Sequence, residues 1–165
     1  MPLPRRLPVL VGLLALAGCA RPDPVVPPPG PASGPPAGGA LGEVPRDLLR
    51  ARERWEDVRP GAYRMALRRS CFCPPDWRGP FAVTVRDGAV ASATYEGAAV
   101  GADRVLTVDA LFDLLADAYR RGAERVDVAY DPDAGFPVRL YIDYDARLAD
   151  EEVGYEVEAF EPLGG

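Results

Sequence analysis

The sequence contains no histidine, lysine, asparagine or glutamine, so all nineteen of its basic residues are arginines. Ser-His-Asp, Cys-His and Ser-Lys catalytic systems each require a general base that this chain lacks. A P-loop requires its own lysine, and zinc sites with histidine ligands are excluded in the same way. The side-chain bases that remain are carboxylates, thiolates and tyrosines. These absences exclude the three nucleophilic systems, nucleotide binding by a P-loop and histidine-ligated zinc for the isolated chain.

Cysteine is also scarce, with three residues, and the first of them follows a signal-like segment. Arg5 and Arg6 form a positively charged start, and residues 7–17 form an apolar core of the length found in signal peptides. A membrane-spanning helix needs about 20 apolar residues, so this core is too short to cross a bilayer. The stretch Leu16-Ala17-Gly18-Cys19 resembles the lipobox of bacterial prolipoproteins. The resemblance implies that residues 1–18 form a lipoprotein signal peptide and that Cys19 is lipidated.

A lipidated Cys19 predicts a location in the bacterial cell envelope, anchored to a membrane by acyl chains. Ala20 follows the cysteine. Because this position does not hold the aspartate that resembles an inner-membrane retention signal, the outer membrane is favoured where a bacterium has two membranes.

The distribution of charge limits which kinds of partner the protein can bind. The formal net charge is −6, and it becomes −8 once the signal removes Arg5 and Arg6. Nucleic acid is therefore excluded as a partner, because binding it requires a basic surface. Residues 45–86 hold ten arginines and five acids, whereas residues 124–165 hold three arginines and twelve acids. The acidic end is either a solvated surface or a docking face for a basic partner or a cation.

Composition divides the chain into a tether and one domain. After Cys19, the segment to residue 44 is dominated by proline, glycine and alanine, which cannot build a core. Residues 19–44 are therefore predicted to be the lipidated cysteine and a tether. Residues 45–162 are long enough for a single globular domain, and residues 163–165 form a tail.

Hydrophobic periodicity predicts an α+β domain. Helical spacing runs from Pro45 to residue 58, and a second helix lies between a Thr107 cap and a Gly122 stop. Alternating patterns predict about six strands, at residues 63–73, 81–85, 89–95, 126–130, 136–142 and 155–160. We expect a mainly antiparallel sheet with both helices on one face and the other face free. The order of one helix and three strands occurs twice, which suggests an internal duplication.

Cys71 and Cys73 are the only cysteines left once Cys19 carries lipid, and disulfides persist outside the cytoplasm. Residues two apart in an extended strand lie at the limit of disulfide reach, so a bridge between them requires a kink, which Pro74-Pro75 favours. A local structural bridge is the favoured interpretation. A redox-active dithiol, a metal site and an intermolecular bond are the alternatives.

Alternating aspartates suggest a second candidate site. Asp131, Asp133, Asp143 and Asp145 supply the hard oxygen ligands that calcium prefers. The twelve-residue calcium loop is only partly matched, because the twelfth residue counted from Asp131 is Ile142 rather than an acid. Solvated hairpin turns are the alternative interpretation, and no cofactor other than calcium is suggested.

The aromatic residues suggest a third kind of site. They could line a ligand surface if several share the free sheet face, and core packing is the alternative. The residues in question are Trp55, Trp77, Tyr63, Tyr95, Tyr130, Tyr141, Tyr144 and Tyr155.

Residues 45–162 also resemble a family of exported bacterial proteins, many of them lipid-anchored, that is known as a domain of unknown function. The resemblance is carried by a strand ending in Cys71-Phe72-Cys73-Pro74 and by a hairpin over residues 83–88. Three shorter segments add to it, at residues 111–113, 130–137 and 150–155. The CxCP segment is the most distinctive of these. What the resemblance implies is export and a small α+β domain, without an activity.

Three functions follow from these features. The favoured hypothesis is a non-catalytic, membrane-tethered module that binds an envelope protein, peptide or polymer through its free sheet face or its acidic end. The alternatives are a thiol-disulfide oxidoreductase that uses Cys71 and Cys73, and a calcium-dependent binding domain.

Overall fold

The structure is a computed structural model that describes residues 42–148 and 150–164. The predicted signal peptide, Cys19 and the predicted tether up to residue 41 lie outside the described residues. The first half of the domain comprises α1 (Arg46–Val58), β1 (Ala62–Cys71), β2 (Phe81–Arg86), β3 (Ala89–Tyr95) and β4 (Ala98–Ala99). The second half comprises α2 (Val108–Arg121), β5 (Arg125–Tyr130), β6 (Pro137–Asp143) and β7 (Glu152–Pro162). Two short 3-10 helices, η1 (Pro75–Trp77) and η2 (Ala102–Arg104), lie in the connections.

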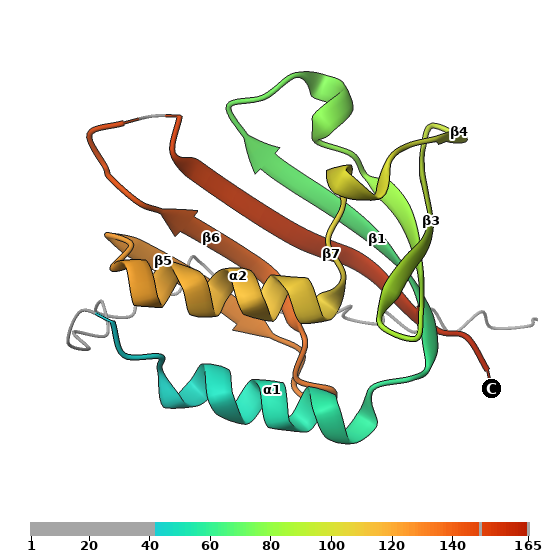
Figure 1. Cartoon of the computed structure of the whole chain (residues 1–165), viewed down its shortest axis with the longest axis horizontal. Coiled ribbons are helices and arrows are strands. Elements are labelled where there is room, and N and C mark those ends of the chain that lie inside the picture. Colours follow the sequence, from blue (N-terminus) through green and yellow to red (C-terminus); the bar gives the residue numbers. More distant parts are fainter. Residues whose placement is uncertain (1–41, 149, 165) are drawn as a thin grey trace, which may run out of the picture. The chain divides into compact units, whose positions relative to one another are not determined.

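The strands form one antiparallel sheet in the order β4-β3-β2-β1-β7-β6-β5 (Figure 1). The first long strand and the last therefore pair at its centre. The predicted α+β class is confirmed, and the sheet has seven strands rather than six because the two-residue β4 pairs with the end of β3. Each helix precedes a three-strand meander, β1-β2-β3 or β5-β6-β7. This order fits the suggested duplication, which stays a prediction.

Both helices have the ends that their sequence predicts. Thr107 caps α2 by accepting a hydrogen bond from the backbone N–H of Ala110 on its side-chain oxygen, at 3.1 Å. Gly122 ends the helix in the left-handed conformation, with φ of 72°. In α1, Pro45 stands just before the first helical residue, and the helix ends before Pro60.

The core lies between the helices and one face of the sheet. Alternate residues of β1, namely Tyr63, Met65 and Leu67, are buried and point toward the helices. Trp55 of α1 packs edge-on against Tyr63 with their rings 5.7 Å apart. On the other side of the core, Phe112 of α2 stacks on Tyr130 of β5. The two helices therefore cover the same sheet face, as predicted.

The other sheet face is charged, and no helix covers it within residues 42–148 and 150–164. Arginines on β1 oppose glutamates on β7 across the two central strands. Arg64 lies 3.7 Å from Glu161, and Arg68 pairs with Glu158. We call this surface the open face. No helix in the described ranges is long and apolar enough to cross a membrane.

Candidate binding surface

A disulfide joins Cys71, the last residue of β1, to Cys73, and their Cα atoms are 5.2 Å apart. The predicted strand over residues 63–73 is therefore too long, because the chain turns at the bridge and enters η1 through Pro74. The kink that the bridge requires is present where the sequence places Pro74-Pro75.

Phe72 lies between the bridged cysteines, and 85% of its surface is exposed. The segment that carries it is held from its C-terminal side, because Arg78 donates a hydrogen bond from Nε to the carbonyl oxygen of Cys73 at 3.0 Å. Arg104 of η2 then pairs with Asp76 at 3.0 Å and lies over the Trp77 ring. A large apolar side chain is thus presented to solvent from a segment restrained by a covalent bond and by two arginines.

An acidic loop adjoins this segment. Cys71 pairs with Val153 of β7, and Asp143 at the end of β6 pairs with Glu152, so the β6–β7 loop lies at the same end of the sheet as Phe72. The loop presents Leu148, which is 45% exposed. Its carboxylates are Asp145, Asp150 and Glu151, and Glu152 follows as the first residue of β7. We call residues 71–77 together with residues 144–148 and 150–152 the Phe72 end.

Phe72 was not among the residues predicted for a site. In the sequence it occurs in an alternating strand pattern, where a phenylalanine is ordinarily a core residue. The signal in the sequence is its position between two cysteines, which places it at the turn that a bridge across one residue requires.

Asp131 and Asp133 form a structural turn. Asp131 accepts hydrogen bonds on Oδ1 from the backbone N–H groups of Asp133, at 3.1 Å, and Ala134, at 2.7 Å. Gly135 has φ of 81°, and a Cβ there would overlap the carbonyl oxygen of Ala51 in α1. The DxDxG pattern therefore reflects a tight turn that packs on α1.

Asp143 and Asp145 lie at the other end of β6. Asp143 pairs with Arg125 of β5 in the sheet register and is only 7% exposed, with no described partner for its Oδ1. Asp145 accepts hydrogen bonds from Arg147, which lowers the pKa of the Asp145 carboxyl. The length of β6 separates this pair from Asp131 and Asp133, so the four aspartates do not form one site. The described residues contain no group of three cysteine or acidic side chains placed to hold a metal.

The aromatic residues do not share the open face. Trp55 and Tyr63 are fully buried beneath the helices. Tyr130 and Tyr155 also point toward the helix side of the sheet, and Tyr141 is the one strand residue of the predicted set that lies on the open face. Core packing therefore accounts for most of this set.

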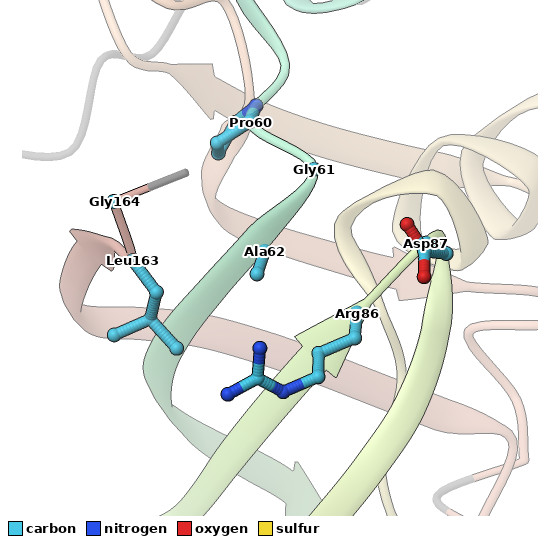
Figure 2. A pocket seen from close by; sticks show the side chains of 7 residues that line it. All are labelled: Pro60, Gly61, Ala62, Arg86, Asp87, Leu163 and Gly164. Carbon is cyan, nitrogen blue, oxygen red and sulfur yellow. The ribbon is translucent and has the colours of Figure 1, made fainter.

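Two shallow hollows adjoin each other where α1 leads into β1. They have volumes of about 340 and 370 Å³ and share Pro60, Gly61 and Asp87. Figure 2 shows the first, with Arg86 at the end of β2 and Asp87 of the β2–β3 turn on one side of Ala62 and Leu163 on the other. One guanidinium and one carboxylate are its ionisable side chains, which is not a nucleophile-and-base arrangement.

Tyr63 lines the second hollow and supports the start of α2. Its hydroxyl oxygen accepts a hydrogen bond from the Val108 N–H at 3.0 Å, and burial raises the pKa of the phenol to about 12. Nearby, Asp109 accepts hydrogen bonds on one carboxylate oxygen from Trp55, at 3.2 Å, and Arg59, at 3.1 Å. These contacts join α1, β1 and α2 at one corner, which indicates a structural role.

A Tyr63→Phe variant is expected to lose about 1–3 kcal/mol of unfolding free energy at pH 7, because the buried Val108 N–H is left unpaired. The raised pKa disfavours the phenolate in the folded state. The stabilisation that the protonated Tyr63 phenol provides is therefore complete below pH 10, and it is lost as the pH rises toward about 12. Urea unfolding from pH 7 to 11 measures both effects. Tyr119→Phe in α2 is the control, with a loss below about 0.5 kcal/mol, and an equal loss in both variants would contradict the assigned role.

Together these features describe a small α+β domain with an open charged sheet face and an apolar residue presented from a disulfide-bridged segment. Residues 47–162 match the model of a family of unknown function, DUF6174, and the chain belongs to this family. The comparisons with curated proteins and with solved structures gave no match. The resemblance to a domain of unknown function is thereby confirmed.

Proposed function

We propose that the protein is a lipid-anchored lipoprotein of the bacterial cell envelope whose domain is a non-catalytic binding module. The anchor is supported by the signal-like residues 1–18 and by the lipobox pattern that ends at Cys19. A tether of residues 19–44 would hold the domain clear of the lipid headgroups. Outer-membrane placement belongs to the same proposal.

The observation that carries the binding function is the exposure of Phe72. Exposing a phenylalanine side chain to water forgoes about 1.5–3 kcal/mol of burial free energy, which a partner's pocket recovers. Aromatic anchors in pockets supply much of the energy of protein interfaces. Because the bridge between Cys71 and Cys73 limits the conformations of the segment, less entropy is lost when Phe72 is captured.

The acidic residues of the Phe72 end indicate the charge of the partner. Asp150 and Glu151 of the β6–β7 loop lie at the same end of the sheet as Phe72, and so does Glu152, the first residue of β7. We therefore infer an envelope protein whose apolar pocket is rimmed by basic side chains, since opposite charges favour encounter and fix orientation.

A thiol-disulfide oxidoreductase is the second candidate, because the Cys71–Cys73 bridge lies at an exposed end of the sheet. This function requires both sulfurs and not the aromatic ring. If Phe72→Ala abolishes the function of the protein in cells while the disulfide stays intact, the binding module is favoured. Loss in Cys71→Ser or Cys73→Ser with Phe72 retained, and no loss in Phe72→Ala, would favour the oxidoreductase.

Site-specific photocrosslinking in cells tests the binding module. A photoreactive phenylalanine analogue replaces Phe72 in one strain and Val58 in another, because Val58 is 55% exposed at the end of α1, outside the Phe72 end. We expect a discrete protein adduct from position 72 and at most a trace from position 58.

Reversing the charge of the acidic loop provides the second arm. Glu151→Arg combined with Glu152→Arg should weaken the adduct from position 72 strongly if the partner's rim is basic. Equal amounts of adduct from positions 72 and 58 would contradict the proposal. If the charge reversal leaves the amount of adduct from position 72 unchanged, the partner's rim is not basic.

A further inference from the structure

The edge of β5 is the starting observation. β5 is the terminal strand of the sheet, with β6 on one side and no strand on the other within the described ranges. Its six residues present backbone N–H and C=O groups along that edge, a template for another strand. The opposite end of the sheet is better covered, because β4 pairs with Thr94 and Tyr95, and Val100 donates a hydrogen bond to the Ala93 carbonyl oxygen at 3.0 Å.

The side chains of β5 divide cleanly between its two faces. Arg125 and Asp127 lie on the open face, opposite Asp143 and Tyr141 of β6, whereas Val126 and Val128 are half-buried on the helix side. Charged side chains protect an edge strand against a second copy most strongly where like charges would face each other. The charges of β5 have opposite signs and are two residues apart.

Antiparallel pairing of two β5 strands has few possible registers, because directly opposed residues must lie on the same face. With Val126 on the two-fold axis, each Arg125 faces the Asp127 of the other copy. With Asp127 on the axis, two carboxylates face each other. With Val128 on the axis the pairing would extend to Tyr130, where a register shift after Ala129 disturbs the strand.

We propose that two copies of this chain associate through antiparallel pairing of their β5 edges, with Val126 at the two-fold axis and Arg125 of each copy opposite Asp127 of the other. The pairing joins the two sheets into one and continues the open face across both copies. Within one copy, Arg125 pairs with Asp127 at 2.6 Å, so the association exchanges this pair within each copy for two pairs between the copies. The inference does not depend on the proposed binding function.

The contact uses about five residues of each strand and exposed ion pairs, which contribute little individually. We therefore expect a dissociation constant between about 10 μM and 1 mM in solution. Attachment to a membrane would raise the effective concentration and favour the dimer there.

Sedimentation equilibrium of the Cys19→Ser chain tests the proposal with charge swaps. We expect a concentration-dependent monomer–dimer equilibrium. Arg125→Asp and Asp127→Arg should each raise the dissociation constant at least about tenfold, because like charges then face each other. The double variant Arg125→Asp with Asp127→Arg should return it to within about threefold of the original value, since the opposed pairs are restored with reversed polarity.

A matched control lies at the centre of the same face. Reversal of the Arg64–Glu161 pair, by Arg64→Glu with Glu161→Arg, should leave the dimer unchanged. Circular dichroism verifies that each variant is folded. A monomer at every concentration up to about 1 mM would overturn the proposal, and so would a double swap that fails to restore the dimer in a folded protein.

Discussion

A Trp55→Ala variant is expected to lower the free energy of unfolding by about 3–5 kcal/mol. The Trp55 side chain is fully buried, and its ring packs edge-on against Phe136 at 5.9 Å and Phe160 at 5.8 Å as well as against Tyr63. Its indole N–H also donates to Asp109 of α2. Truncation therefore opens a cavity between α1 and the sheet and removes a bond between the two helices.

Urea unfolding followed by far-ultraviolet circular dichroism measures this loss. Trp55→Phe should show an intermediate loss, because it keeps much of the apolar contact while removing the hydrogen bond to Asp109. Val58→Ala, at an exposed position of the same helix, should change stability by less than about 0.5 kcal/mol. A loss below about 1 kcal/mol in Trp55→Ala would mean that α1 is not held by this residue.

The second large effect is expected outside the described residues. Cys19→Ser should transfer most of the protein from the membrane fraction to the soluble fraction or block its processing, because the serine has no thiol to acylate. Two or more acyl chains give stable anchoring, and the Cys19→Ser chain cannot acquire the acyl chains that the thiol would carry.

Fractionation by ultracentrifugation, with a high-salt wash to remove proteins held by charge alone, measures the distribution. The matched control is Cys71→Ser with Cys73→Ser, which removes the other two thiols and should leave the protein in the membrane fraction. Equal membrane retention of Cys19→Ser and the original chain, with residues 1–18 removed from both, would refute lipid anchoring at this residue.

Strong local signals in the sequence account for the parts of the fold that were predicted. The Asp87-Gly88 dipeptide predicts a two-residue hairpin, and both residues have positive φ, at 49° and 77°. The Thr107 cap and the Gly122 stop predict the bounds of α2 to the residue. In these cases the chemistry of one or two residues decides the local conformation.

Where distant residues decide the conformation, the sequence is a weaker guide. β7 begins at Glu152, three residues earlier than its pattern predicts, because Glu152 pairs with Asp143 of β6 and Val153 with Cys71 of β1. Glu158 is an extra residue opposite the Ala66–Leu67 step, and this bulge interrupts the alternation.

The candidate sites show the same limit. The bridge between Cys71 and Cys73 is predicted because they are the only two cysteines left once Cys19 is set aside, and the structure contains it. The spacing of Asp131 and Asp133 suits both a calcium loop and a tight turn, and the structure shows a turn in which Asp131 accepts two backbone hydrogen bonds. The calcium hypothesis stays a prediction. The exposure of Phe72 depends on the turn that the bridge imposes, which no periodic pattern represents.

The intact mass of the protein purified from membranes in detergent tests the central claim, that the domain acts from a lipid anchor. The account predicts a chain that begins at Cys19, lacks residues 1–18 and carries the mass of a diacylglyceryl group, with or without a third acyl chain on its amine. A membrane-bound chain that retains residues 1–18, or one that begins at residue 19 or later without added lipid, would contradict it.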